Sequence, residues 1–378
     1  MPTPPTASIL AHFHDLDDPR ISPATRHELL DIVAIALCAV ICGADSWVEV
    51  AAFGHAKRSW LSTFLALPHG IPSHDTFGRV FAALDPAQFE TGFRSWVATV
   101  ARLTGGEVVA VDGKTLRRSH DRPNGQAALE LVSAWAGTNR LVLGQVAVTE
   151  GSNEIPAIPA LLRHLVLDGC IVTVDAIGCQ TEIATQIAGQ GADYVLALKE
   201  NQPTLHEAVA ILFREGQAGG FVAGHHAFRR TVEKNHGRIE VRQVWTVDDP
   251  EVLAYLNPQG AWPRLRSVGM VVAERQIGAQ RSRETRYYLS SLPGDAATLG
   301  DAVRGHWGIE NSLHWVLDIA FREDESRVRQ GHADQNLALL RRLALNLLRQ
   351  ETTAKMGVKA KRLKAGWDDA YLLKLLDS

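Results

Sequence analysis

Apolar residues near the N-terminus recur at the spacing of a helix. Six of them fall three or four residues apart along one predicted helical face: Leu29, Ile32, Val33, Ala36, Leu37 and Val40. Such spacing is typical of an amphipathic or buried helix. Residues 47–53 and 60–67 continue the pattern, and Ser73, which follows Pro72, is a suitable N-cap for another helix. Residues 1–104 are therefore predicted to form a small all-α domain.

The periodicity changes at Gly105 and Gly106, where we place a domain boundary. Beyond it, short apolar runs rich in β-branched residues predict strands. These runs cover residues 108–112, 128–136, 141–148, 171–174 and 194–198, with helical patterns at 158–167 and 178–188. Three strands followed by helix, strand, helix and strand predict an α/β domain with a partly antiparallel sheet.

Residues 203–292 are less regular than the segments on either side. A helix is predicted near residues 205–213, followed by strands at 238–245, 265–274 and 285–289. The pattern indicates a β-rich insertion, or an extension of the sheet.

The C-terminal third is predicted to be mainly helical. Residues 301–321 are predicted to be helical, and leucines at helical spacing make 335–349 strongly amphipathic. A second domain is therefore placed at residues 105–352. Residues 353–378 are predicted to form a basic tail that either contacts phosphates or is merely solvated.

Composition is that of a globular protein with a sizeable core. The 378 residues are 46% hydrophobic and 21% charged. A net charge of -3 does not favour a general polyanion binder, so any nucleic-acid surface must be local. The four cysteines form no Cys-x-x-Cys pair, which predicts free thiols in a reducing compartment. The apolar run 32–44 is too short to span a bilayer, so a soluble cytoplasmic protein is expected.

Candidate chemistry lies where two strands and a later helix carry acids. The run 108–111 leads into Asp112, the run 171–174 leads into Asp175, and the helix predicted for 301–321 contains Glu310. Strand ends on one edge of a sheet lie roughly 5–10 Å apart. Three carboxylates so close would repel unless divalent cations lay between them, and oxygen ligands suit Mg²⁺ or Mn²⁺ better than zinc. Two such ions can hold both oxygens of an in-line phosphoryl transfer.

Three segments carry a resemblance to a known family: Val111-Asp112-Gly113-Lys114, Val174-Asp175-Ala176, and the stretch from His306 to Trp315. In them the chain resembles the DDE transposases of bacterial insertion sequences. The branch with a separate helical N-terminal domain, which includes the H-repeat-associated proteins, is the most similar. The resemblance extends from about Ile9 to Leu348.

This resemblance implies an RNase H-like core with a β-rich insertion at residues 203–292. The catalytic acids would be Asp112, Asp175 and Glu310, binding two Mg²⁺ ions, with Mn²⁺ as a substitute. Many relatives carry Tyr, Arg and Lys at positions where this chain has Val303, His306 and Leu317. Arg304 or His306 is expected to replace the missing phosphate contact.

DNA is the partner that the resemblance implies. Contacts to it are expected from basic and polar residues close to the acids: Lys114, Arg117, Lys199, Arg304, His306, Asn311 and His314. The helical domain would recognise the terminal inverted repeats, although composition alone equally allows a packing domain with a solvated basic face. Because two DNA ends must be joined, a homodimer or larger assembly on DNA, in the bacterial nucleoid, is expected.

Three functional interpretations stay open. The chain is a transposase that cleaves element ends and transfers strands, an RNase H-like nuclease that does not join strands, or a domesticated DNA-binding protein without catalysis. The spacing of His306, Glu310 and His314 also allows a zinc site, although the resemblance favours Glu310 as a Mg²⁺ ligand. For Trp307 and Trp315, core packing is favoured over stacking on a flipped base.

Overall fold

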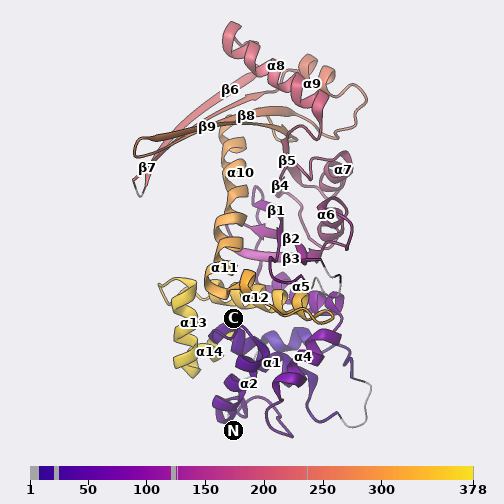
Figure 1. The fold of residues 1–378 in the computed structure, drawn as a ribbon. Helices are drawn as coiled ribbons and strands as arrows, with labels where there is room; N and C mark the ends of the chain where they lie inside the picture. The colour runs from indigo at the N-terminus through magenta and orange to yellow at the C-terminus, as the bar shows by residue number, and fades with distance from the viewer. Residues whose placement is uncertain (1–7, 21–24, 121–124, 126, 236, 378) are drawn as a thin grey trace.

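The computed structural model describes residues 8–20, 25–120, 125, 127–235 and 237–377. A long, curved sheet runs through most of the molecule, and a helical layer lies at the end that contains both chain termini (Figure 1). The predicted fold class, an RNase H-like α/β core with a β-rich insertion after an all-α segment, is confirmed.

In the described residues before the sheet, there are six helical elements. They are the 3₁₀ helix η1 (Ser8–Phe13), α1 (Leu29–Cys42), α2 (Trp47–Ala56), α3 (Arg58–Leu61), α4 (His74–Ala83) and α5 (Pro86–Val100). Ser46 and Glu49 form a capping box at the start of α2, and the Ser73 side chain caps α4 as predicted. α1 ends where Gly43 adopts a φ of 116°, which glycine accepts without strain.

Nine strands form one sheet in the order β3-β2-β1-β4-β5-β9-β8-β7-β6. The core strands are β1 (Val108–Thr115), β2 (Glu130–Ala136), β3 (Leu141–Ala147), β4 (Ile171–Val174) and β5 (Asp193–Leu198). β1 pairs antiparallel with β2 and parallel with β4, and β4 pairs parallel with β5. The sheet is therefore partly antiparallel, as the order of elements predicts.

The insertion extends this sheet. Its strands are β6 (His226–Asn235), β7 (Arg238–Val247), β8 (Ser267–Ile277) and β9 (Gln280–Ser290), with helices α8 (Pro203–Gly219) and α9 (Pro250–Leu256). β9 pairs antiparallel with β5, which joins the four strands to the core. The sequence pattern did not predict β6 or α9. β6 has no buried position among its described side chains, so it lacks the apolar alternation that indicates a strand.

Helices cover both faces of the core sheet. α6 (Glu154–Leu162) and α7 (Thr181–Gly189) lie on one side, and α10 (Ala296–Gly308) lies on the other, against β1 and β4 (Figure 1). α10 continues as a π-helix, η3 (Ile309–His314), and then as α11 (Trp315–Phe321) and the short 3₁₀ turn η4 (Glu323–Glu325). The prediction that residues 301–321 are helical is confirmed, and the structure adds a π-helical segment in the middle of this range.

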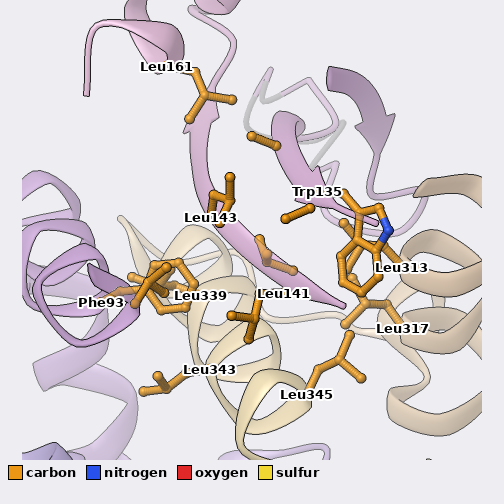
Figure 2. Packing of buried hydrophobic residues seen from close by; sticks show 14 of the residues in the cluster. Phe93, Trp135, Leu141, Leu143, Leu161, Leu313, Leu317, Leu339, Leu343 and Leu345 are labelled. Carbon is orange, nitrogen blue, oxygen red and sulfur yellow. The ribbon is translucent and has the colours of Figure 1, made fainter. Parts of the chain in front are cut away.

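α12 (Ala333–Gln350) packs between the N-terminal helices and the sheet. Its leucines meet Phe93 of α5 and Leu141 and Leu143 of β3 (Figure 2). Two buried amides tie it to both neighbours. Asn336 donates to the carbonyl oxygens of residues 81 and 84, each at 2.9 Å, and Asn346 exchanges two 2.9 Å hydrogen bonds with the backbone of Val142.

The C-terminal residues form two helices, α13 (Val358–Trp367) and α14 (Asp369–Leu376), and α13 packs on α1 and α12. Both interpretations of the basic run, phosphate contact and solvation, are wrong for Lys361 and Arg362, which are buried. Lys361 Nζ donates to the Leu348 carbonyl at 2.8 Å, and Arg362 donates to the Val40 carbonyl at 2.7 Å. These two cations satisfy the open ends of other helices instead.

The four cysteines are free, as predicted, and Cys38, Cys170 and Cys179 are buried. Over the ranges described above, no single helix has the length and apolarity to cross a membrane. The bent pair α1 and α2, at 97° to each other, meets those two criteria when taken together.

Candidate active site

The two predicted aspartates lie side by side on neighbouring strands. β1 and β4 run parallel, and their register pairs Val111 with Val174. Asp112 and Asp175 are the next residues along the chain, so both reach the same edge of the sheet. β4 ends at this point, whereas β1 continues to Thr115 in its pairing with β2.

Glu310 approaches this edge from the π-helix that follows α10. The imidazole of His314 lies between the acids, with Nδ1 3.6 Å from Asp112 Oδ2 and 3.7 Å from Glu310 Oε2. Asp112, Asp175 and Glu310 all line one cavity of about 250 Å³. The structure thus brings together the three acids that the sequence singles out.

The electrostatics of the site reflect this crowding. Burial, followed by the negative charges of Asp175 and Glu310, raises the pKa of Asp112 to about 7. Burial, together with the cations of Arg342 and Lys114, lowers the pKa of His314 to about 3, so its ring is neutral at neutral pH. A carboxyl group whose pKa is raised beside two other carboxylates is typical of a cation-binding site, because the bound cation offsets the repulsion among the negative charges.

The side chains present fit a divalent cation. Asp112, Glu310 and His314 each offer one ligand atom, and these atoms lie within 4.8 Å of one another. Carboxylate oxygens are the ligands that Mg²⁺ and Mn²⁺ prefer. His306 is not in this group among the residues the structure describes; its Nδ1 instead lies 3.0 Å from Thr173 Oγ1 on β4. The geometry therefore does not support a zinc site made from all three of His306, Glu310 and His314.

A fourth carboxyl, Glu154, lies behind Asp112. It is the first residue of α6, and a Cβ built on Gly113 would meet its Oε1 at 1.9 Å. Burial, a hydrogen bond with Glu130 and the charge of Asp175 raise the pKa of Glu154 to about 8. β1 runs through Asp112 and Gly113 to Thr115, so the strand extends beyond the predicted range 108–112. Glycine is required at position 113 by the close approach of Glu154, which no sequence pattern reveals.

Replacing Gly113 by Ala should displace Glu154, because the new methyl group and the carboxylate cannot occupy the same space. We expect the free energy of unfolding to fall by about 1–3 kcal/mol, as for other overpacked sites, measured by urea denaturation. Gly137→Ala is the matched control, since its nearest neighbour would lie 3.7 Å from the added Cβ. Removing the obstacle in Gly113→Ala/Glu154→Ala should recover part of the loss. The explanation would be contradicted if Gly137→Ala lost as much unfolding free energy as Gly113→Ala. It would also be contradicted if the double variant were no more stable than Gly113→Ala.

Two of the predicted DNA contacts, Lys114 and Arg117, are held by acids. Lys114 is hydrogen-bonded to Asp318, and its Nζ lies 3.6 Å from Glu323 and from Asp324. The Lys114 side chain is 9% exposed, whereas that of Arg117 is 83% exposed and contacts Asp324 at 3.2 Å. Lys114 is thus an internal cation beneath the site, and Arg117 is the more accessible of the two.

Lys199 and His306 line the same cavity as the three acids. Lys199 is exposed just after β5. Its loop is tied to the loop that follows Asp175, because Asn201 donates to the Ala176 carbonyl at 2.6 Å. Lys199 and the two aspartates therefore belong to one connected framework.

Arg304 and Asn311 line a neighbouring hollow of about 260 Å³. Arg304 forms a two-pronged ion pair with Glu233 of β6, and Asn311 donates to the Trp307 carbonyl at 2.8 Å. Both residues face solvent near the acids, but each has a protein partner in the absence of DNA.

The preference for core packing is wrong for both tryptophans. Trp307 is 42% exposed and Trp315 is 60% exposed. The Arg286 guanidinium stacks over the Trp307 ring at 4.3 Å, and both side chains line the cavity with the acids. Sequence reasoning missed Arg286, because only the pairing of β9 with β5 brings it to the site.

Ionising Asp112 should destabilise the metal-free protein. Its pKa is about 7 when folded and near 3.8 when unfolded, so the folded state binds the extra proton and loses stability as pH rises through this interval. Asp112→Asn cannot ionise, and its melting temperature in EDTA should exceed that of the wild type increasingly from pH 5 to pH 8, by a few degrees. Comparing variant with wild type cancels the opposite contribution of histidines such as His314. A constant difference across pH would contradict the assigned pKa.

Comparisons with known proteins follow the same division of the chain. The family described as Transposase DDE domain matches residues 103–347, and the one described as DDE_Tnp_1-associated matches residues 10–97. The chain is 39% identical to "Putative transposase YncI" of Escherichia coli O157:H7, over 98% of this chain and 95% of that protein. It is 36% identical to "H repeat-associated putative transposase YhhI" of Escherichia coli strain K12, over 97% of each. Among solved structures, it is similar to the piggyBac transposase in a synaptic complex with hairpin DNA, with a TM-score of 0.41 and 10% identity over 98% of this chain and 78% of that one.

Proposed function

The chain belongs to the transposase DDE domain family, and from this premise we propose that it cleaves DNA at the ends of an insertion sequence and joins them to target DNA. The observation that carries the proposal is the convergence of Asp112, Asp175 and Glu310 on one cavity. Water would attack a phosphodiester and release a 3′-hydroxyl at the element's end. That hydroxyl would then attack a target phosphodiester in a second in-line displacement. Neither step requires a covalent protein intermediate or an external energy source.

We assign the three acids as ligands of two Mg²⁺ ions. Bound there, the ions would stabilise the attacking and leaving oxygens of each displacement. Asp112 and Asp175 offer oxygens from adjacent strands, a rigid base for a pair of ligands. Glu310 offers the third from the π-helix. Crowding raises the pKa of Asp112, which favours any cation that relieves the repulsion.

The DNA backbone would lie across the rim of the cavity. We assign Lys199 and Arg286, which line this cavity, to hold phosphates there, with His306 and Asn311 as polar neighbours, and we assign the exposed Arg117 to a phosphate outside the cavity. Arg304 would exchange Glu233 for a phosphate. We further propose that residues 1–104 recognise the terminal repeats, that residues 105–352 carry catalysis, and that the protein acts as a homodimer or larger assembly in the nucleoid.

A single assay tests the proposal. The purified chain is incubated with linear DNA that carries the repeats flanking its reading frame, together with a target plasmid, in Mg²⁺ or in EDTA. We expect Mg²⁺-dependent nicking at the repeat ends and joined products in the plasmid, with neither on scrambled ends. Cleavage without joining would favour the RNase H-like nuclease. Tight binding of the ends without cleavage would favour the non-catalytic DNA-binding protein.

A further inference from the structure

His314 lies beside Asp112 and Glu310, yet the three-acid site does not account for it. The side chain is 6% exposed, and Nδ1 faces Asp112 and Glu310. The other ring nitrogen, Nε2, is buried and has no hydrogen-bond partner among the described residues. A buried imidazole without any close hydrogen bond is unusual, because leaving a buried polar group unpaired costs about 1–3 kcal/mol.

The two carboxylate oxygens nearest Nδ1 are too far from it for hydrogen bonds, yet all three atoms are close enough to surround one cation. The distances to Asp112 Oδ2 and Glu310 Oε2 are 3.6 and 3.7 Å, beyond the range of about 2.7–3.2 Å for a hydrogen bond from nitrogen to oxygen. Two ligands of one octahedral cation with bonds of about 2.1 Å lie about 3.0 Å apart when adjacent and about 4.2 Å apart when opposite. The observed distances exceed the adjacent spacing, so Nδ1 and the two oxygens would move together by about 0.6–0.7 Å to bind one such cation as neighbouring ligands.

The backbone explains how His314 comes to face the two acids. Glu310 and His314 both belong to the π-helix Ile309–His314 and are four residues apart, so they lie on the same side of it. That side faces β1, where Asp112 lies. π-helical segments are frequently found at functional sites. His306, on the regular helix before it, instead contacts Thr173.

We propose that His314 is itself a metal ligand, and that its Nδ1 joins Asp112 and Glu310 in holding one of the two cations. This inference rests on the proposed function, because the cation is one that the reaction uses. It replaces the expectation that His314 contacts DNA. An imidazole ligand makes the site a mixed nitrogen and oxygen site, which favours Mn²⁺ over Mg²⁺.

The test reads the nitrogen ligand directly. The full chain is loaded with Mn²⁺, its affinity is measured by electron paramagnetic resonance, and pulsed spectra are searched for coupling to an imidazole ¹⁴N. We expect the coupling in the wild type and its loss in His314→Gln, with Mn²⁺ binding weakened about tenfold or more. His306→Gln is the matched control. It removes the other histidine of the cavity and should keep the coupling.

Each outcome decides the matter. Wild-type Mn²⁺ without ¹⁴N coupling overturns the inference even if His314→Gln fails to fold, because the wild-type spectrum alone is sufficient. Coupling that survives in His314→Gln and disappears in His306→Gln also overturns it. In both cases the metal assignment of the proposed function would still stand if Asp112→Asn lost Mn²⁺ binding, because that loss would show that the acids hold the ion. A wild type that binds no Mn²⁺ at all would overturn both the inference and the metal assignment of the proposed function.

Discussion

Asp112→Asn, Asp175→Asn and Glu310→Gln should each lower the rate of Mg²⁺-dependent cleavage at element ends by about a thousandfold or more. Each change removes an anionic oxygen from the cavity where the three acids meet. Charge stabilisation by a metal ion is worth several kcal/mol, and each 1.4 kcal/mol is about tenfold in rate. The measurement is a single-turnover rate on end-labelled DNA, with end binding followed separately by gel shift.

Asp301→Asn is the matched control for this series. Asp301 lies on α10, the helix that leads into the π-helix of Glu310. Its side chain, however, is 69% exposed and pairs with Arg229. It should cleave at the wild-type rate. If one of the three acid variants also kept that rate, its residue would not belong to the catalytic set. Loss of end binding in all three would indicate a folding defect and not a catalytic one.

Removing Glu323 should destabilise the fold more than any of the other single substitutions. Glu323 and Arg342 form a 2.8 Å ion pair whose two side chains are both 0% exposed, and Lys114 lies 3.6 Å from the same carboxylate. Glu323→Ala would leave two cations facing each other without their shared anion. Breaking a buried pair in this way costs about 3–5 kcal/mol. Urea denaturation at neutral pH measures the change.

Glu325→Ala provides the contrast, since Glu325 pairs with Arg322 on the surface and its loss should change stability little. Replacing both partners, as in Glu323→Leu/Arg342→Met, should cost less than Glu323→Ala, because no buried charge of the pair is then left alone. Equal losses of unfolding free energy in Glu323→Ala and Glu325→Ala would show that the buried ion pair contributes no more to stability than the surface pair.

The two aspartates proposed to be catalytic could be found from the sequence, because each marks the end of a simple pattern. Asp112 and Asp175 each close a short apolar run, and such runs predict buried strands reliably when they are rich in β-branched residues. The pairing of Val111 with Val174 could not be read from the sequence, because register depends on which strands become neighbours. The order of the acids along the chain was therefore predictable from the sequence. Their convergence in space could be seen only from the pairing of the strands in the sheet.

Other parts of the site leave no such trace. The Glu154 carboxyl lies against Gly113, a contact between residues far apart in sequence, and the π-helix that carries Glu310 looks in sequence like ordinary helix. Lys114 follows the first acid as a DNA contact should, yet acids distant in sequence surround it. A charged residue's partners are set by tertiary packing, and local pattern carries no information about them.

The placement of α12 has a genetic consequence. Its Asn336 fastens the N-terminal helices and its Asn346 fastens β3, so one late segment of the chain holds both halves. A shortened copy of the gene that stopped before Ala333 would encode the N-terminal helices without the helix that covers them. We expect such a product to be degraded and not to accumulate as a folded competitor. Truncated copies of this gene should therefore be recessive and should not interfere with the product of an intact copy.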